Sequence, residues 1–250
     1  MPLISIQVDH FATLRELKHL REPDPSHAAV IAELAGVDGV CCHLREYRRA
    51  IRDRDLYILK EVVKTKLNVQ IAPNDDLMER VIEVKPWMVT LMPLTEDNPS
   101  IQTGIDLEHN RDMYAESAAS LKNAGVNVSY FIDPEIDAVK HAAKARADAV
   151  ALNAFRYISA ESIEGAEAEL DRIEQIAQLA SKLNMMVFCG NGINYRNIRP
   201  MVELGIIDEF VVGYAIICRA TLVGLERAVR EIVDKVHHPV TKTSYLHGRY

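Results

Sequence analysis

The chain has 250 residues, of which 48% are hydrophobic and 26% charged, and its formal net charge is −7 at pH 7. This is enough apolar material for a large core, and the negative charge argues against a nucleic-acid or anionic-membrane partner. No apolar run approaches the roughly 20 residues that span a bilayer, and no basic segment precedes an apolar core at the N-terminus. We therefore expect a cytoplasmic protein with no membrane partner.

Short apolar runs alternate with helix-like segments along the whole chain. The expected strands are Leu3–Val8, Gly39–His43, Leu67–Ala72, Trp87–Leu91, Val126–Ile132, Ala147–Leu152, Met186–Cys189 and Glu209–Val212. The expected helices are Asp24–Ala35, Arg54–Thr65, Leu77–Val84, Leu107–Ala124, Glu135–Ala145, Ala160–Leu183, Tyr195–Leu204 and Ala215–Val236. Short apolar strands that alternate with helices are typical of parallel βα units whose sheet is covered on its outer face.

Two Asp-Pro pairs have the residue types of a helix start. Asp24-Pro25 and Asp133-Pro134 each place a side-chain acceptor before a proline suited to the first helical turn. We therefore expect both aspartates to cap helices.

Eight βα units predict a single-domain (β/α)8 TIM barrel over residues 1–236, with extra helices or loops and a C-terminal tail at 237–250. A doubly wound open sheet is the alternative. Such a sheet usually carries a glycine-rich phosphate turn after its first strand, and Asp9 to Arg15 contains no glycine.

Polar residues follow several of the expected strands. Asp9 and His10 follow the first strand, His43 ends the second with Arg45 close behind, and Asn191 lies between two glycines after the seventh. Because the carboxyl ends of barrel strands share one rim, we expect these side chains to converge there. A structural histidine is the alternative for His43, and a structural amide is the alternative for Asn191.

Two connections are longer than a minimal barrel needs. Glu16 to Glu22 is charged, and Pro93 to Gly104 is polar and follows the fourth strand. Long loops at the rim are usually lids or binding loops.

Several motifs together resemble one family, the pyridoxine 5'-phosphate synthases of bacterial vitamin B6 biosynthesis. The run Asp9-His-Phe-Ala-Thr-Leu-Arg15 reproduces the family's first motif, and His43 to Asp55 reproduces its second. Pro23-Asp-Pro25, Tyr130 to Asp133 and Gly213 to Ile217 are also similar to the family. The resemblance extends to about Val236.

The resemblance implies a homo-oligomeric barrel, an octamer by analogy, that acts on phosphorylated small molecules without a cofactor. The implied reaction condenses 1-deoxy-D-xylulose 5-phosphate with 3-amino-2-oxopropyl phosphate and releases phosphate and water. Within it, His43 is implied as general acid/base and Asp9, His10 and Arg45 as ligands of the deoxyxylulose phosphate. The backbone N–H groups of Gly192 and Gly213 are implied to bind the other phosphate.

This chain departs from the family at the chemistry. Gln70 stands where the family has a catalytic glutamate, and Asn191 where it has a catalytic histidine, and neither amide can shuttle a proton. Losing one general acid or base commonly costs on the order of 10² to 10⁴ in rate. Further replacements relative to the family are Gln7 for asparagine, Lys18 for arginine, Ala50 and Tyr214 for histidines, and Ala151 to Phe155 for a Glu-x-His-Thr-Gly run.

Three interpretations therefore stay open. The protein makes pyridoxine 5'-phosphate with its remaining groups, or it acts on a different carbonyl and amine substrate, or it binds a phosphorylated metabolite without catalysis. The expected site comprises His43, Gln70 and Asn191 as catalytic positions and Gln7, Asp9, His10, Lys18, Arg45, Gly192, Gly213 and Tyr214 as substrate-binding positions. The four cysteines have no zinc-type spacing, so we expect free thiols and no metal.

Overall fold

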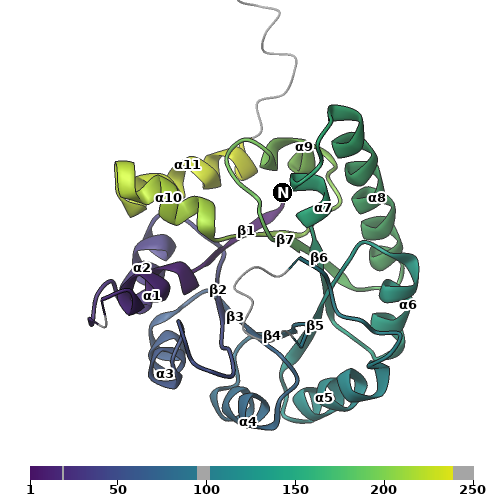
Figure 1. Ribbon diagram of the computed structural model, residues 1–250, viewed down its shortest axis with the longest axis horizontal. Coiled ribbons are helices and arrows are strands. Elements are labelled where there is room, and N and C mark those ends of the chain that lie inside the picture. Colours follow the sequence, from purple (N-terminus) through teal and green to yellow (C-terminus); the bar gives the residue numbers. More distant parts are fainter. Residues whose placement is uncertain (19, 95–101, 239–250) are drawn as a thin grey trace, which may run out of the picture.

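The computed structural model describes residues 1–18, 20–94 and 102–238, and within them eight parallel strands close into a barrel in chain order. Figure 1 looks into the ring of strands and shows the helices around it. The strands are β1 (Leu3–Gln7), β2 (Gly39–His43), β3 (Lys66–Ile71), β4 (Met88–Leu91), β5 (Asn127–Ile132), β6 (Ala149–Asn153), β7 (Met186–Gly190) and β8 (Glu209–Val212). Because β8 pairs with β1, the (β/α)8 prediction is confirmed and the open sheet is excluded.

Each predicted helical segment contains a helix, and the structure adds others. The helices are α1 (Asp9–Glu16), α2 (Pro25–Leu34), α3 (Asp53–Val62), α4 (Asp75–Val84), α5 (Arg111–Asn123), α6 (Ile136–Lys144), α7 (Phe155–Ile158), α8 (Ile163–Lys182), α9 (Ile198–Glu203), α10 (Tyr214–Val223) and α11 (Leu225–His237). The short helices α1 and α7 were not predicted. The last predicted helix is in fact two, because Gly224 adopts φ 85° and ψ 155°, a conformation open only to glycine.

Helix α1 begins one residue after β1 ends, with Val8 as its N-cap residue. Its inner face buries Phe11, Ala12 and Arg15, which have the spacing of a helical face. Asp9 therefore belongs to a first helical turn rather than to an extended strand end.

Only one of the two Asp-Pro pairs caps a helix. The Oδ1 of Asp24 accepts a hydrogen bond from the backbone N–H of Ser26 at 2.9 Å, as predicted. The second prediction is wrong, because α6 begins at Ile136 and the carboxylate of Asp133 accepts instead from the side chain of Asn153. Asp133 is thereby recruited to the interior of the rim.

Two apolar clusters fill the molecule. The larger lies between strands and helices and receives alternate strand residues such as Ile4 and Ile6. The smaller fills the barrel itself and consists of Met88, Met92, Phe131, Ala149, Ala151 and Phe188. The barrel interior also holds polar pairs, among them the Ser5 hydroxyl, which donates to Glu209 at 2.5 Å.

Strand register determines which side chains reach the carboxyl rim. Following the pairing around the barrel places Gln7, Gln70, Phe131 and Gly190 at one level, and His43, Met92 and Asn153 at the level above. Inward side chains of alternate strands form such layers in (β/α)8 barrels. The upper two layers form the floor of the site.

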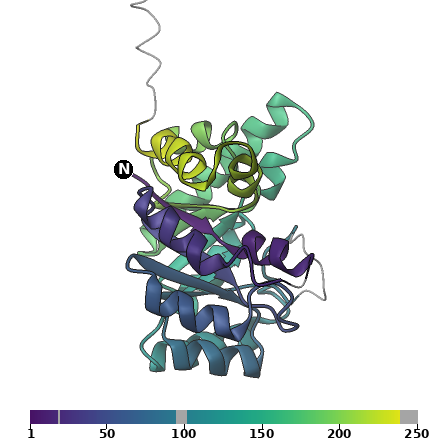
Figure 2. The ribbon, with the colours of Figure 1, turned by 90° about the vertical axis from the view of Figure 1, so that its left-hand side faces the viewer.

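The side of the ring shown in Figure 2 carries α1 and α2, with α10 and α11 above them and α3 below. At the end of the described chain, the His237 ring lies 3.3 Å from Asp38, so this first residue of the predicted tail belongs to α11. Residues 239–250 lie outside the described residues, and the division at 236/237 stays a prediction. In the described part, no helix has the length and apolarity to cross a membrane.

Candidate active site

A cavity of about 660 Å³ opens at the carboxyl ends of the strands. This volume is in the usual range for small-molecule sites. Its wall includes four predicted residues that we call the acid–base cluster: Asp9, His10, His43 and Arg45. The structure therefore brings together the residues that follow β1 and β2, as the sequence predicted.

Asp9 is buried, and its carboxylate accepts two hydrogen bonds from neighbouring residues. One carboxylate oxygen accepts from the backbone N–H of His43 at 2.7 Å, and the other accepts from Nε2 of Gln7. Burial raises the pKa of Asp9 from its ordinary 3.8 to about 6, against the lowering effects of these hydrogen bonds and of Arg45. Asp9 therefore changes charge close to neutral pH.

His43 and His10 are neutral imidazoles at physiological pH. Burial, together with the smaller effect of the nearby Arg45 charge, lowers the pKa of His43 from its ordinary 6.5 to about 3. The same two causes lower the pKa of His10, whose ring packs edge-on against Tyr214 at a centroid distance of 5.4 Å. A neutral imidazole offers one N–H donor and one acceptor nitrogen, so each ring can both donate and accept a hydrogen bond.

Of the arginines after β2, Arg45 and Arg49 line the cavity. Arg48 pairs with Asp53 at 2.5 Å and also with Asp76, and Arg52 pairs with Glu16 at 2.8 Å, so both guanidinium groups have carboxylate partners. The position of Arg49 was missed, because the sequence gives no sign of which member of an Arg-Arg pair turns inward. Two guanidinium groups at one mouth favour a phosphate-bearing ligand.

The two amides at the family's acid/base positions, Gln70 and Asn191, also line the cavity. The Oε1 of Gln70 accepts from Nε2 of Gln7 at 3.1 Å. Asn191 has φ 71° and donates from Nδ2 to the Oδ1 of Asn153 at 2.8 Å. Much of the remaining wall is apolar, with Met92, Leu94, Phe131, Ala151 and Val211.

Asn153 connects three segments of the rim although it is only 2% exposed. Its Nδ2 donates to Asp133 at 2.8 Å and to the carbonyl of Gln102 at 2.9 Å, and its Oδ1 accepts from the N–H of Phe155. Gln102 lies near the end of the predicted long loop and Leu94 near its start, whereas residues 95–101 lie outside the described residues. The described ends of this loop therefore both border the site.

Four predicted binding residues are not part of the cavity wall. Lys18 is exposed beyond α1, and Tyr214 is 68% exposed. Gly213 lies against the site, since a Cβ there would meet the His10 ring at 3.3 Å, and Gly192 has φ 90° and packs against Ile158. The ligand roles given to these four residues stay predictions.

The ends of the two long motifs have a structural role. The guanidinium of Arg15 makes a bidentate pair with the carboxylate of Asp55 at 2.8 and 2.6 Å, and it also donates to the carbonyl of Ala50. Both side chains are buried, at 2% and 0% exposure. This pair ties α1 to α3 behind the acid–base cluster.

Among the described residues, no group of three or more His, Cys, Asp or Glu side chains could hold a metal ion. All four cysteines are free. Burial raises the pKa of Cys189, which borders the cavity, to about 12, so this thiol is not a ready nucleophile.

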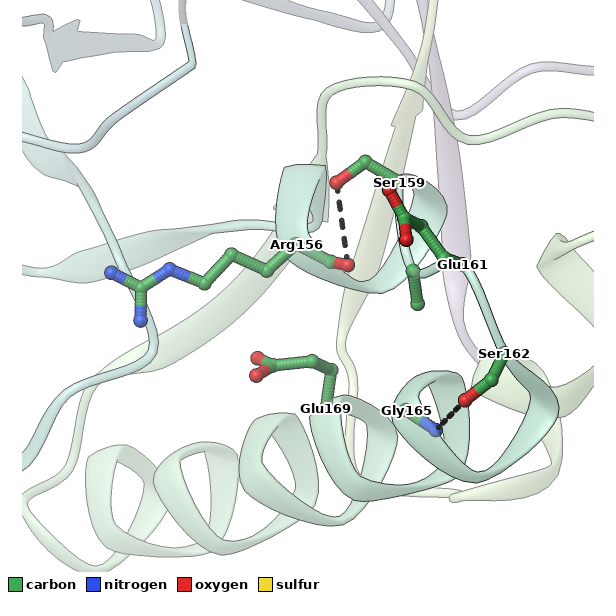
Figure 3. A pocket seen from close by; sticks show the side chains of 7 residues that line it. Arg156, Ser159, Glu161, Ser162, Gly165 and Glu169 are labelled. Atoms are coloured by element: carbon green, nitrogen blue, oxygen red, sulfur yellow. Dashed lines mark hydrogen bonds between the residues drawn. The ribbon is translucent and has the colours of Figure 1, made fainter.

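A second hollow of about 530 Å³ lies at the turn between α7 and α8 and shares no lining residue with the cavity (Figure 3). There the hydroxyl of Ser162 caps α8 by accepting from the N–H of Gly165 at 3.0 Å. Arg156 extends away from that cap and lies 3.3 Å from Glu135. These partners are structural, so we place the candidate active site at the barrel mouth.

Comparison with known sequences gives a match over almost the whole chain. A family model described as "Pyridoxal phosphate biosynthesis protein PdxJ" matches residues 4–238. The pyridoxine 5'-phosphate synthase of Geotalea uraniireducens (strain Rf4) is 43% identical over 238 residues, which cover 95% of this chain and 100% of the relative. The enzyme of the same name from Geobacter sulfurreducens is 41% identical with the same coverage.

Solved structures of similar fold are more distant. Phosphoribosyl anthranilate isomerase from Thermus thermophilus has a TM-score of 0.60 at 13% identity and covers 94% of this chain and 98% of that one. Orotidine 5'-phosphate decarboxylase from Pyrococcus horikoshii OT3 has a TM-score of 0.61 at 12% identity, with 94% and 99% coverage. At such identities these neighbours support the barrel fold alone.

Proposed function

The chain belongs to the pyridoxine 5'-phosphate synthase family, and from this premise we propose that its barrel cavity makes pyridoxine 5'-phosphate in vitamin B6 biosynthesis. The substrates are 1-deoxy-D-xylulose 5-phosphate and 3-amino-2-oxopropyl phosphate. The observation that carries the proposal is the convergence of Asp9, His10, His43 and Arg45 on one cavity in a chain that matches the family from end to end.

His43 is the general acid/base of this reaction. Its imidazole is neutral and lies at the end of β2 in the cavity wall. Among the described residues, no hydrogen bond to the ring would have to break before a substrate could bind it. A neutral imidazole takes a proton when the amine adds to the ketone and returns it to the oxygen that leaves as water. Arg45 supplies the positive charge that a phosphorylated ketone needs.

Substrate binding divides between the cluster and the rim. Asp9 and His10 orient the deoxyxylulose chain beside Arg45, and the backbone N–H groups of Gly192 and Gly213 receive the second phosphate. Gly213 lies against Gln7 and His10, which supports a ligand reaching from the cluster toward that turn. The Tyr214 ring packs against His10 at this corner, whereas the ligand role of Lys18, which is exposed just after α1, follows from the family resemblance.

A second candidate is a related condensation of a different carbonyl and amine pair. The amides Gln70 and Asn191 favour it, because they occupy the wall where the family reaction draws on two titratable groups. The phosphate-binding arginine and the His43 chemistry are common to both candidates.

We also propose that the protein is a cytoplasmic homo-oligomer. Large exposed apolar side chains gather on α1, α2, α10 and the segment after α1: Leu14, Leu17, Leu20, Val30, Ile31, Leu34, Tyr214 and Leu222. These helices are neighbours on one side of the ring (Figure 2). An apolar face of this kind fits a second copy of the chain better than bulk water. The four free cysteines suit a reducing compartment.

The test is a direct assay with both substrates at high enzyme concentration. We expect inorganic phosphate release and the pyridoxine chromophore in equal amounts. Phosphate esters that stabilise the fold against heat without any turnover would show a binding protein, and turnover only with another amine would favour the second candidate.

A further inference from the structure

One nitrogen, Nε2 of Gln7, donates to two neighbours in the cavity floor. It donates to the carboxylate of Asp9 and, at 3.1 Å, to the Oε1 of Gln70. An ionised carboxylate only accepts hydrogen bonds, so Asp9 determines which end of the Gln7 amide faces it. The orientation of Gln7 then determines that of Gln70.

The hydrogen-bonded series of Asp9, Gln7 and Gln70 determines which end of the Gln70 amide faces the cavity. Its oxygen is engaged by Gln7, so Nε2 is the polar atom that the side chain offers to the cavity it lines. The position therefore presents a hydrogen-bond donor, whereas an ionised glutamate in the same place presents only acceptors.

A second hydrogen-bonded series at the mouth has the same arrangement of a carboxylate, a bridging amide and a cavity-lining amide. Asp133 accepts from Nδ2 of Asn153, and the Oδ1 of Asn153 accepts from Nδ2 of Asn191 at 2.8 Å. Arg156, drawn in Figure 3, lies 4.0 Å from the carboxylate of Asp133. In both series a carboxylate orients the cavity-lining amide through two successive hydrogen bonds.

We propose that Gln70 is a catalytic hydrogen-bond donor to the ketone oxygen of the bound substrate, and that Gln7 is the residue that positions it. The inference rests on the proposed function, because it takes a phosphorylated ketone as the ligand. It replaces proton transfer at this position with electrostatic stabilisation of an oxygen that gains negative charge.

The step balances without a proton from Gln70. The amine nitrogen forms a bond to the carbonyl carbon, and the C=O π pair moves to oxygen, where the Gln70 N–H stabilises it. The amine proton goes to the neutral imidazole of His43 and returns from there to the oxygen. The amide is unchanged at the end of the step.

The discriminating variants are Gln70→Glu and Gln70→Met. At pH 8 we expect each to lower kcat by on the order of 10² to 10³, the usual loss for one such donor. Gln178 is exposed on α8, so Gln178→Glu and Gln178→Met are matched controls expected to keep native rates. A Gln70→Glu variant that equals or exceeds the native protein in making pyridoxine 5'-phosphate overturns the proposal.

The pH profile adds a readout that a purely structural role would not move. A carboxyl group at this position regains a donor when it is protonated, so the Gln70→Glu variant should recover rate as the pH falls through the pKa of that new group. The Gln70→Met variant should show no such recovery. Parallel profiles for the two variants contradict the donor role.

The positioning role of Gln7 is tested by a double-mutant cycle. If Gln7 acts through Gln70, Gln7→Met should lower kcat in the native background and have little further effect in the Gln70→Met background. Equal losses of rate in both backgrounds would show that Gln7 acts by another route.

Calorimetric binding of 1-deoxy-D-xylulose 5-phosphate separates this inference from the proposed function. If the native protein makes no pyridoxine 5'-phosphate but Gln70→Glu weakens ketose-phosphate binding at pH 8 and restores it in acid, the function fails and the donor stands. If the native protein turns over and Gln70→Glu binds and reacts as well, the donor fails and the function stands. No binding to the native protein removes both.

Discussion

At the scale of single residues, the site combines one set of titratable groups with a set of oriented amides. Asp9, His43 and Arg45 come from the ends of the adjacent strands β1 and β2 and the connections that follow them. Gln70 lies in β3 and Asn191 directly follows β7, and both are oriented by hydrogen bonds. Both His43 and His10 line the cavity, and the His10 ring also packs edge-on against Tyr214.

Replacing His43 should remove most of the turnover and little of the binding. We expect His43→Gln to lower kcat by on the order of 10² to 10⁴, the usual contribution of one general acid/base. The Kd of 1-deoxy-D-xylulose 5-phosphate should stay within several-fold, because Arg45 still provides the charge. His141→Gln on α6 is the matched control. A loss of affinity that accounts for the whole loss of rate would assign His43 to binding.

Activity should rise with pH through about 6. The burial of Asp9 raises its pKa to about 6, and only the ionised carboxylate accepts from both Gln7 and His43. The pKa of His43, about 3, is too low to produce this change. The kcat/KM profile should therefore show one acid limb near pH 6, which Asp9→Asn removes. A limb that survives in Asp9→Asn would identify another group.

The same pKa shift has a consequence for stability with the opposite sign. Because the folded-state pKa of Asp9 lies above the ordinary 3.8, this group favours the folded state below about pH 4, and that contribution is lost as pH rises to about 6. The loss is on the order of 3 kcal/mol at most. Urea unfolding of the ligand-free protein across this window, beside Asp9→Asn, measures it.

At the scale of elements, the first recognition motif lies in α1 and the second runs from the end of β2 to the start of α3, and the buried Arg15–Asp55 pair joins the two helices. The pair lies behind the acid–base cluster, between the helix that begins with Asp9 and the helix that follows the His43 segment. It therefore ties α1, which supplies Asp9 and His10, to the helix that follows the His43–Arg45 connection.

Breaking this pair should be far more costly than breaking its surface neighbour. Asp55→Asn removes the bidentate partner of a buried guanidinium and leaves Glu16, 3.4 Å away, as its carboxylate neighbour, so we expect a cost of at most about 3 to 5 kcal/mol. Asp53→Asn, two residues earlier in the same turn, removes a partly exposed pair with Arg48 and should cost less than about 1 kcal/mol. Urea unfolding at one protomer concentration compares them. Similar losses for both would show that the buried pair is not a clamp.

The fold was largely predictable from sequence at this scale, and the connections were not. Apolar runs and helical periods located all eight strands, because each strand is buried on both faces. Helix α1 was missed because no turn residue separates it from β1, and the α10–α11 break was missed because Gly224 gave no sign of its positive φ.

The candidate site was predictable where it follows one strand and not where it depends on distant partners. Position at a strand end was enough to bring Asp9, His43 and Arg45 together. The Asn153 connections and the Gln7–Gln70 bond join residues 20 to 63 positions apart, which no local pattern reports. Asp133 precedes a proline as a helix N-cap residue often does, yet its carboxylate accepts a hydrogen bond from Asn153 instead.

At the scale of the whole molecule, the site residues and the exposed apolar side chains lie in different parts of the barrel. The mouth of the barrel holds the chemistry, and the side formed by α1, α2 and α10 holds many of the large apolar side chains exposed on the described surface. Since α1 begins with Asp9 and α10 follows Gly213, this face is continuous with the elements of the site (Figure 2). Association through it would brace the helices that position the acid–base cluster.

A charge placed on this face should dissociate the proposed homo-oligomer. Leu34 on α2 is 75% exposed, and Ile163 at the start of α8 is exposed to the same extent on another side of the ring. We expect Leu34→Lys to shift the protein to a smaller species in sedimentation at micromolar concentration, because burying an unpaired ammonium in an interface is unfavourable. Ile163→Lys should leave the native size unchanged. A native protein that sediments as a monomer, or equal effects of the two variants, would place the apolar face outside any contact between copies.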